Sequence, residues 1–267
     1  MKRTVMTIAG SDSSGGAGIQ ADLKTFAALG VYGTCAITAV TAQGSTGVRA
    51  IHELPPEVVA AQIDAVVGDM GVDAVKTGML ANAGIVCVVA ERVRQHRLPN
   101  LVVDPVLAAK SGDRLLREDA VDVLKAELLP LCTVVTPNIP EAEALVGCRL
   151  ERDEDLEWAA REIGALGAGK VVITGGHASG PEAVDLLYDG RGFRRFSAPR
   201  LATAHGRGAG CTFASAIAAW LALGADVEES VARAKEYVTA ALEHAFALGK
   251  GPGPVHHFYR WWEGEVR

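Results

Sequence analysis

Short apolar runs rich in β-branched residues alternate with longer helix-forming stretches along most of this chain. Continuous apolar runs of this length are typical of strands that lie in a parallel sheet covered on both faces. Six such strands are expected, at residues 4–9, 36–41, 74–77, 101–104, 134–136 and 171–174. The stretches between and after them are expected to be helices, at residues 17–29, 56–67, 83–95, 118–129, 153–166, 212–223 and 227–248.

Residues 183–188 and 193–197 are two further strand candidates, joined by the turn sequence DGRG at 189–192. Such a turn predicts a hairpin, so the sheet is expected to gain antiparallel strands near one edge. The whole pattern predicts a three-layer α/β/α sandwich with a mostly parallel central sheet. No linker, charge block or internal repeat divides the chain, and residues 1–267 are expected to form a single domain.

The composition of the chain argues against several classes of function. Hydrophobic residues make up 49% of the 267 residues, enough for a large core, and the net charge of −6 argues against a nucleic-acid partner. The five cysteines form no C-x-x-C pair, which disfavours a disulfide framework or a zinc site and favours a reducing compartment. No apolar segment reaches the ~18 residues of a membrane span, so we expect a cytoplasmic protein with no membrane partner.

The sequence GRGAGC at 206–211 places three glycines at alternate positions just before a predicted helix. A glycine turn that opens a helix directs unpaired N–H groups at one point, and the helix dipole adds to their effect. That geometry suits a phosphate or the transition state of a phosphoryl transfer. An ordinary turn before a core helix would have the same spacing, so both interpretations stay open on spacing alone.

Ligands of open α/β sheets bind beyond the carboxyl ends of the strands. The first strand is followed by GSDSSGGAG at 10–18, which contains neither G-x-G-x-x-G nor G-K-[ST]. A substrate pocket lined by small residues remains, and so does a helix N-terminus capped by Ser13 or Ser14. The amide of Gln43 could bind a heterocycle edge or lie on a surface loop. The thioether of Met79 could pack on a flat ring or belong to the core.

Polar side chains follow the later strands as well. Asp104 is placed to bind Mg²⁺ through water, to orient a hydroxyl group, or to cap a loop. Asn138 and Glu141 could hold a hydrated Mg²⁺ together with phosphate oxygens, although a capping box would have the same spacing. Gly175 and Gly176 form a second glycine turn, which could bind a nucleotide or only reverse the chain.

These stretches belong to a longer set of motifs: IAGSD at 8–12, SGGAGIQADLKTF at 14–26, AVTAQ at 39–43, KTGML at 76–80, VDPV at 103–106, AKSGD at 109–113, TPNIPEA at 136–142, AKEYV at 234–238 and GKGPGPVHHF at 249–258. Together they resemble the ribokinase-like superfamily and, within it, the hydroxymethylpyrimidine/phosphomethylpyrimidine kinase family of thiamine biosynthesis. The resemblance runs from one end of the chain to the other.

The resemblance implies an ATP-dependent, Mg²⁺-dependent kinase with a ribokinase-like fold, commonly a homodimer. It would phosphorylate 4-amino-5-hydroxymethyl-2-methylpyrimidine, and then convert the monophosphate into the diphosphate. Pyrimidine contacts are expected at Gly10, Ala17, Gln43, Met79 and Val106, with Gln43 pairing to the aminopyrimidine edge.

The resemblance also implies the phosphate site and the catalytic residues. ATP and its phosphates are expected at Asp104, Lys110, Thr136, Asn138, Gly175, Gly176 and Ala209. Mg²⁺ is expected at Asn138, at Asp104 and, through water, at Glu141. Catalysis is expected to involve Arg207, Gly208, Gly210 and Cys211.

Two stretches depart from the family pattern. The chain has GRGAGC at 206–211 where the family usually has THGTGC, and TGGH at 174–177 where the family usually has KGGH. Arg207 could restore the lost positive charge and bind a phosphate with its planar guanidinium. The glycines and Cys211 are retained, and backbone N–H groups are indifferent to side-chain loss.

Many sugar kinases of the superfamily have an aspartate base at the position of Cys211. A free thiol has a pKa of ~8.5, which a helix N-terminus can lower, so Cys211 is a candidate base. It could instead only shape the pocket, because a loose phosphoryl-transfer transition state demands mainly positioning and charge stabilisation. The alternatives for the whole chain are a pyridoxal kinase of the same fold, a catalytically weak regulator that binds nucleotide or pyrimidine, and, more remotely, a Rossmann oxidoreductase.

Overall fold

The computed structural model describes residues 2–109, 112–175 and 180–262. Within these ranges nine strands form one sheet, in the order β3-β2-β1-β4-β5-β6-β7-β8-β9. The strands are β1 Thr4–Asp12, β2 Tyr32–Gly44, β3 Gly47–Glu53, β4 Ala74–Thr77, β5 Leu101–Val103, β6 Val134–Val135, β7 Val171–Ile173, β8 Glu182–Tyr188 and β9 Phe193–Pro199. The six central strands, β2, β1, β4, β5, β6 and β7, are parallel. At one edge β3 pairs antiparallel with β2, and at the other β8 pairs antiparallel with both β7 and β9.

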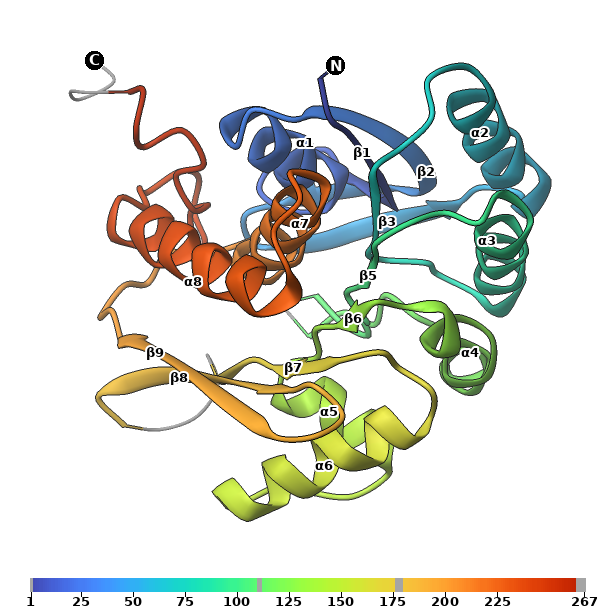
Figure 1. The fold of residues 1–267 in the computed structure, drawn as a ribbon. Helices are drawn as coiled ribbons and strands as arrows, with labels where there is room; N and C mark the ends of the chain where they lie inside the picture. Colours follow the sequence, from blue (N-terminus) through green and yellow to red (C-terminus); the bar gives the residue numbers. More distant parts are fainter. Residues whose placement is uncertain (1, 110–111, 176–179, 263–267) are drawn as a thin grey trace.

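Helices cover both faces of the sheet (Figure 1). One face carries α1 Gly18–Ala28, α7 Ala209–Ala222 and α8 Val227–Glu243, and the other carries α2 Pro56–Asp69, α3 Ala83–His96, α4 Glu118–Val123, α5 Ile139–Val146 and α6 Asp153–Ala165. Successive strand residues point to opposite faces: Val102 packs into the core beneath α7, and Val103 into the core on the other side. The predicted three-layer sandwich with a mostly parallel sheet is confirmed.

Several element bounds differ from the sequence expectation. The edge strand β3 was not predicted, because most of its side chains are exposed and its sequence GVRAIHE has no apolar run. Antiparallel strands therefore lie at both edges of the sheet, not only at the edge with the hairpin of β8 and β9. The helix expected at 118–129 is α only to Val123 and continues as a π turn and a 3₁₀ turn, which contains Pro130.

The order of the strands creates a switch point beside β1. The chain leaves β1 through α1 and enters β2 on one side, and it later reaches β4 on the other side of β1 through α2 (Figure 1). Connections that diverge in this way leave a crevice at the carboxyl ends of the two neighbouring strands. The strand order therefore predicts a crevice after Asp12 and Thr77, the last residues of β1 and β4.

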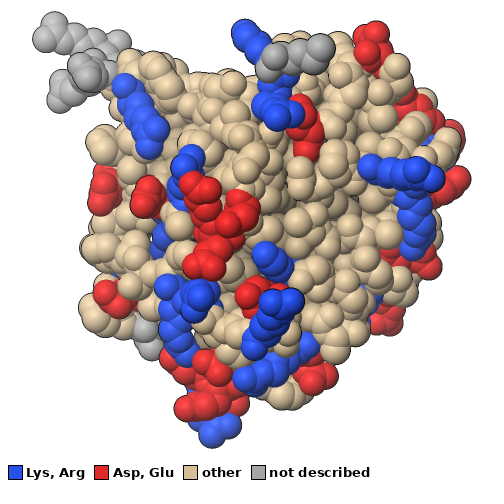
Figure 2. Space-filling view, in the orientation of Figure 1, with Lys and Arg blue, Asp and Glu red and all other residues tan. Residues whose placement is uncertain are grey.

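Basic and acidic side chains are interspersed on the face of the molecule in Figure 2. Many of them form exposed ion pairs, for example Arg195 with Asp153 at 2.8 Å and with Glu157 at 3.1 Å. Within the described ranges, none of the helices is both long and apolar enough to cross a bilayer.

Candidate active site

Gly10 and Met79 form the contact between the ends of β1 and β4. A Cβ atom on Gly10 would lie 2.9 Å from the sulfur of Met79, so only glycine fits there without displacing the methionine. Met79 is buried, and its carbonyl accepts a 2.6 Å hydrogen bond from the hydroxyl of Thr38. The structure thus brings together two of the five residues expected to contact the pyrimidine.

Two helix N-termini meet at this crevice. Helix α1 begins at Gly18, which has a φ of +57° and lies so close to β1 that a Cβ atom would be 2.4 Å from the carbonyl oxygen of Gly10. Helix α7 is preceded by Gly208, which has a φ of +84°. A Cβ atom on Gly208 would be 2.0 Å from the carbonyl oxygen of Gly16. Glycine is required at both sites because the left-handed conformation and the close backbone approach exclude a side chain.

The first turn of α7 provides the N–H groups that the sequence predicted. The N–H of Thr212 donates to the carbonyl of Gly208 at 2.8 Å and begins the helical hydrogen bonds. The N–H groups of Gly210 and Cys211 precede that bond, where a helix leaves its amide donors unpaired. Ala209 is the first residue of the helix. This helix end is therefore suited to bind an anion.

A buried ion pair lies beneath the crevice. The Lys76 ammonium is 3.0 Å from each carboxylate oxygen of Asp22, and neither side chain is exposed. Asp22 also accepts hydrogen bonds from the hydroxyl groups of Thr7 and Ser215, at 2.6 and 2.7 Å. Burial lowers the pKa of Lys76, but the negative groups around it outweigh burial, and the net effect raises that pKa. Lys76 is therefore a permanent positive charge at the base of the site.

Asp104 follows β5 and lies beside the same ammonium. Its Oδ2 atom is 3.6 Å from the Lys76 nitrogen, and it has no hydrogen-bond partner within the described part of the chain. Burial raises the pKa of Asp104 to about 6, although Lys76 acts in the opposite direction. A buried carboxylate oxygen that has no hydrogen bond and only an ammonium at 3.6 Å is costly, and a closer cation would relieve that cost.

Cys211 lies near these charges and near the N-terminus of α1, where the backbone of Gly18 acts to lower the pKa of its thiol. Desolvation raises the pKa of the Cys211 thiol to about 12, because it outweighs the attraction of Lys76, and the charges of Asp104 and Asp22 raise it further. The lowering expected from a helix N-terminus is therefore outweighed by desolvation in the structure. The thiol is protonated at neutral pH.

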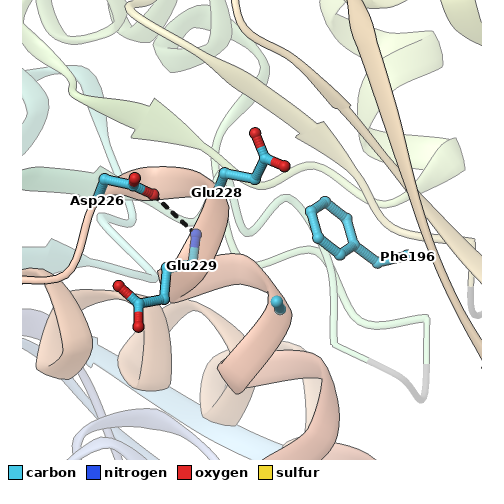
Figure 3. Close-up of a pocket in the computed structure, with 5 residues that line it drawn as sticks. Phe196, Asp226, Glu228 and Glu229 are labelled. Atoms are coloured by element: carbon cyan, nitrogen blue, oxygen red, sulfur yellow. Dashed lines mark hydrogen bonds between the residues drawn. The ribbon is translucent and has the colours of Figure 1, made fainter.

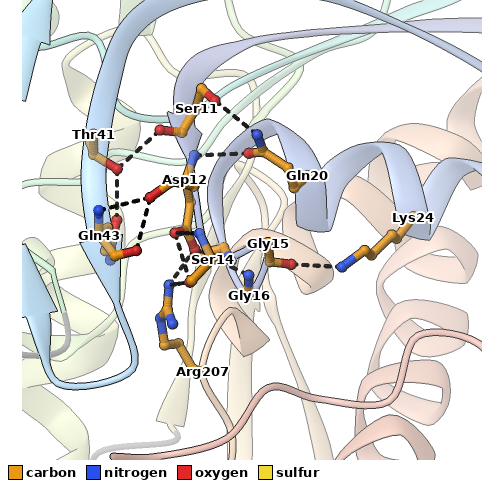
Figure 4. Close-up of polar contacts among 12 residues, drawn as sticks. Ser11, Asp12, Ser14, Gly15, Gly16, Gln20, Lys24, Thr41, Gln43 and Arg207 are labelled. Atoms are coloured by element: carbon orange, nitrogen blue, oxygen red, sulfur yellow. Dashed lines mark hydrogen bonds and ion pairs between the residues drawn. The ribbon is translucent and has the colours of Figure 1, made fainter. Parts of the chain in front are cut away.

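The turn between β1 and α1 is built around the carboxylate of Asp12 (Figure 4). Asp12 accepts hydrogen bonds from the backbone N–H groups of Ser14 at 2.9 Å, Gly16 at 3.1 Å and Ala17 at 2.8 Å. The same carboxylate forms an ion pair with Arg207, and the Arg207 guanidinium also bonds the hydroxyl of Ser14. Arg207 is therefore directed at this turn.

Gln43 lies next to the same turn, at the end of β2. Its side-chain oxygen accepts a 3.1 Å hydrogen bond from the hydroxyl of Thr41, and its backbone forms two 2.9 Å hydrogen bonds with the hydroxyl of Ser13. Ser13 thus binds Gln43 and does not cap α1, which begins after Ala17 without a side-chain cap. Val106 is half-buried and donates its N–H to the carbonyl of Asp104.

Asn138 and Glu141 form a capping box at the start of α5. The Asn138 side chain accepts from the Glu141 N–H, and the Glu141 carboxylate accepts from the Asn138 N–H, both at 2.9 Å. Burial, together with the negative charge of Asp104, raises the pKa of Glu141 to about 8. The structure therefore contains the capping box that the sequence left open. The carboxyl groups of Glu141 and Asp104 repel each other.

Two other predicted phosphate residues have structural partners. The backbone of Thr136 donates to the carbonyl of Val103 at 2.9 Å and continues the pairing of β6 with β5. Gly175 donates its N–H to Asp185 at 2.9 Å, and a Cβ atom there would be 1.9 Å from a carbonyl oxygen of β8. Close packing alone thus requires glycine at 175.

Two further residues expected to bind ATP, Lys110 and Gly176, lie outside the described residues.

Asp12, Asp22 and Lys76 were not identified as site residues from the sequence. Lys76 stands in the otherwise apolar strand AVKT, and a lone charge inside a buried strand indicates a buried partner. That signal could have found Lys76, but the identity of its partner depends on the packing of α1 against β1 and on the pairing of β1 with β4.

A hollow of about 240 Å³ adjoins Arg207. It is lined by Ser14, Gly16, Ser45, Arg207, Leu248, Gly249, Pro252 and Pro254. A second hollow, of about 280 Å³, lies between β9 and the start of α8 (Figure 3). Its acidic residues belong to the first turn of α8, where Asp226 caps the N–H of Glu229 at 2.9 Å, so helix capping accounts for them.

The described residues contain no cluster of three or more His, Cys, Asp or Glu side chains that could hold a metal ion. A Mg²⁺ ion at Asp104 and Glu141 would therefore need water or phosphate oxygens to complete its coordination, which is usual for this ion.

Comparison with known proteins identifies the family. A family model described as phosphomethylpyrimidine kinase matches residues 12–256. A hydroxymethylpyrimidine/phosphomethylpyrimidine kinase of Rhizobium meliloti is 49% identical over 98% of this chain and 100% of its own length. A thiamine biosynthesis bifunctional protein of Geobacter sulfurreducens is 51% identical over 95% of this chain, which spans only 52% of that longer protein.

Solved structures agree with this relationship. A pyridoxal kinase of Bacillus subtilis in complex with ADP has a TM-score of 0.90 at 41% identity, over 96% of this chain and 98% of that one. A phosphomethylpyrimidine kinase of Clostridium difficile has a TM-score of 0.80 at 43% identity, over 89% of this chain and 98% of that one. By sequence and by structure, this chain belongs to the phosphomethylpyrimidine kinase family, within the ribokinase-like fold.

Proposed function

We propose that the chain transfers the γ-phosphoryl group of ATP to the hydroxymethyl group of 4-amino-5-hydroxymethyl-2-methylpyrimidine, and then a second phosphoryl group to the monophosphate. The observation that carries this proposal is the meeting of the N-termini of α1 and α7 beside the contact of Gly10 with Met79. A thioether surface for a flat ring and an anion-binding helix end would then lie side by side. Phosphoryl transfer to a pyrimidine needs both.

The pyrimidine is proposed to lie at the ends of β1, β2 and β4. Gly10 leaves room for the side chain of Met79. Met79 would pack against the ring, and Gln43 would pair with its amino edge. Ala17 and Val106 complete the pocket, and both are only partly buried. The ring would thus be held by close backbone and thioether contacts, with one amide fixing its orientation.

The phosphates of ATP are proposed to lie between α7 and the ends of β5 and β6. The N–H groups of Gly210 and Cys211 would stabilise the charge that develops in the transition state, and Gly208 gives the turn its shape. Ala209, also expected at the phosphates, donates its N–H to the carbonyl of Gly206 at 3.3 Å. On the other side, the residues expected at the phosphates are Asp104, Lys110, Thr136, Asn138, Gly175 and Gly176.

Mg²⁺ fits the residues present. Asp104 has a buried oxygen without a hydrogen-bond partner in the described part of the chain, and Glu141 is destabilised by the charge of Asp104. Asp104 and Asn138 would hold the ion, with Glu141 acting through water. When bound, Mg²⁺ supplies positive charge that neutralises the phosphate oxygens.

Cys211 has a candidate role at the acceptor hydroxyl. Because its thiol is protonated at neutral pH, it would act as base only if ligand binding changed its surroundings. The turnover number against pH, for the wild type and Cys211→Ser, tests this role. A role as base predicts that the substitution removes an ionisation from the profile, and an unchanged profile would leave Cys211 with a shaping role only.

The test of the proposed function is incubation with the hydroxymethylpyrimidine and Mg·ATP, followed by mass spectrometry. We expect the monophosphate first and the diphosphate later. Binding of both ligands without product would instead support a regulator with weak catalysis, and no binding of either would overturn the proposal.

Pyridoxal kinase activity is the second candidate, because the Bacillus subtilis pyridoxal kinase matches this chain with a TM-score of 0.90. Pyridoxal is also a flat heterocycle with a hydroxymethyl group. Turnover of each substrate alone, and of the two in competition, measures the preference. We expect the pyrimidine to be preferred because Gln43 matches its amino edge.

We further propose that the chain works in the cytoplasm. Each chain would form a single kinase domain, and two chains would form a homodimer. All five cysteines are free thiols, which fits a reducing compartment. Val40 and Ile51 on the edge hairpin are 46% and 38% exposed, and a second copy could cover them. Sedimentation velocity measures the oligomeric state.

A further inference from the structure

The side chain of Arg207, one of the predicted catalytic residues, contacts the turn after β1. Its guanidinium is only 11% exposed and forms an ion pair with Asp12, which is 3% exposed (Figure 4). It also bonds the hydroxyl of Ser14. The ion pair directs the guanidinium at the turn after β1, and capture of a phosphate at its Nη2 atom would break the pairing with Asp12.

Arg207 also packs on the turn that it binds. A Cβ atom on Gly16 would lie 3.3 Å from the guanidinium carbon, so the guanidinium lies directly on the backbone of Gly16. The neighbouring Gly208 lies closer still, because a Cβ atom on it would be 2.0 Å from the carbonyl oxygen of Gly16. The start of α7 and the turn at 12–17 are therefore joined by side-chain and backbone contacts together.

The backbone of Arg207 is fixed as well. Its N–H donates to the carbonyl of Gly253 at 3.1 Å, and its carbonyl accepts from the N–H of Val255 at 3.3 Å. Arg207 thus reaches the turn from a position held by the C-terminal segment, which limits the freedom of its side chain.

Asp12 transmits this contact to the pyrimidine pocket. Its carboxylate holds the N–H groups of Gly16 and Ala17, and the adjacent Ser13 hydroxyl holds the backbone of Gln43. A change in the position of Asp12 would therefore move two of the proposed pyrimidine contacts, Ala17 and Gln43.

We propose that Arg207 is a positioning residue for the pyrimidine. Through Asp12 it holds the turn at 12–17 against the start of α7, and so fixes the pyrimidine pocket relative to the anion-binding helix end. This inference rests on the proposed kinase function and replaces the expectation that Arg207 binds a phosphate of ATP. It predicts that Arg207 affects the binding of the acceptor pyrimidine and not the binding of ATP.

Steady-state kinetics with each substrate varied in turn test the inference. For Arg207→Ala we expect KM for the pyrimidine to rise about 10- to 100-fold, the range for loss of a hydrogen bond between charged groups, with KM for ATP nearly unchanged. Arg207→Lys should recover part of the loss. Arg194→Ala, which removes an exposed partner of Glu228, is the matched control and should behave as the wild type. A rise in KM for ATP alone, or no change in either KM, would overturn the inference.

A double-mutant cycle tests the route through Asp12. If Arg207 acts through Asp12, Arg207→Ala should add little to KM for the pyrimidine once Asp12→Asn is present. Fully additive effects would show that Arg207 acts elsewhere.

Arg207→His supplies a titratable version of the contact. Histidine binds Asp12 as a cation only when protonated, so KM for the pyrimidine should rise from pH 6 to pH 8 in this variant more steeply than in the wild type. The titratable groups near the contact, Lys24 on the carbonyl of Gly15 and His205 on the N–H of Gly253, occur in both proteins, so the comparison cancels them. Parallel profiles would contradict the inference.

Hydrogen exchange of the turn at 12–17 tests this inference independently of the kinase proposal, because it needs no substrate. The amides of Ser14, Gly16 and Ala17 should exchange faster in Arg207→Ala than in the wild type, without any substrate present. If the wild type fails to phosphorylate the pyrimidine, the kinase proposal fails, and this measurement still decides whether Arg207 holds the turn. Unchanged exchange would show that it does not.

Discussion

Lys76 is a charged residue enclosed in an apolar strand, and its tolerance there depends on Asp22. Both side chains are fully buried, and Asp22 is satisfied by four hydrogen bonds from three residues. Removing one member of such a pair leaves a buried charge without compensation. The pair also sets the electrostatic surroundings of Asp104 and Cys211.

Lys76→Met should therefore destabilise the fold by about 3–5 kcal/mol, the range for breaking a buried ion pair. Urea denaturation measures this free energy. Arg152→Met, which removes the exposed partner of Asp155, is the control and should have a far smaller effect because solvent screens that pair. Equal losses in the two variants would contradict the importance of burial.

Glu141 makes stability depend on pH. Its pKa is about 8 in the folded chain, well above the ~4.3 of an exposed glutamate. The folded state therefore binds more protons than the unfolded state between these values, and stability falls as pH rises from ~4 to ~8. Asp104, with a folded pKa of about 6, adds an effect of the same sign up to that pH.

Without Mg²⁺, the free energy of unfolding of the wild type should fall between pH 5 and pH 8, and Glu141→Gln should flatten that slope. The variant keeps an acceptor for the N–H of Asn138 but has no charge, so at pH 8 it should be more stable by about 1–3 kcal/mol. Urea denaturation across this pH range is the measurement. Glu118→Gln, at an exposed glutamate of α4, should keep the wild-type slope.

At the scale of elements, the start of α7 combines a tight turn with an open helix end. Gly208 has a positive φ and lies against the carbonyl of Gly16, whereas a Cβ atom on Gly210, two residues later, would contact nothing within 4 Å. The two glycines look alike in the sequence. Only the first is required by the packing of α7 against the turn after β1.

Gly208→Ala should destabilise the protein by about 2–4 kcal/mol, because it combines a left-handed conformation with steric overlap. Gly210→Ala should leave stability unchanged or raise it by up to about 1 kcal/mol, since alanine favours a helix. Thermal and urea denaturation of both variants make the comparison. A larger loss for Gly210→Ala than for Gly208→Ala would contradict this geometry.

At the scale of the whole molecule, the proposed site joins both ends of the chain. The turn at 12–17 comes from the start, and α7 together with residues 253–255 comes from the end. A ligand that binds between them binds only the folded chain, so it stabilises the entire domain by mass action.

Mg·ATP at 100 times its Kd should therefore raise the free energy of unfolding by about 2.7 kcal/mol, seen as a rise in Tm. If Mg²⁺ neutralises Asp104 and Glu141 as proposed, chelation with EDTA should remove most of that rise. ATP in EDTA serves as the control. An equal rise with and without EDTA would contradict a metal role for these carboxylates.

The sequence by itself determined the layers, the parallel centre of the sheet and the family. These follow from local patterns: apolar runs such as VVI in β7 can be buried only in a covered sheet, and the motif at 14–26 is specific to the family. The sequence left open a close backbone approach by the small residues at 10–18. Gly18 makes such an approach, because its Cβ position is 2.4 Å from the carbonyl oxygen of Gly10.

Only the tertiary structure decided the electrostatics and the pairing of distant residues. No local pattern joins Arg207 to Asp12 or Lys76 to Asp22, because these partners come from elements that meet only after the sheet has formed. Burial likewise raises the pKa of Cys211, where the helix position alone predicted the opposite. Local periodicity determines elements and layers, but desolvation and ion pairing depend on what packs around a side chain, and that is fixed only in the folded molecule.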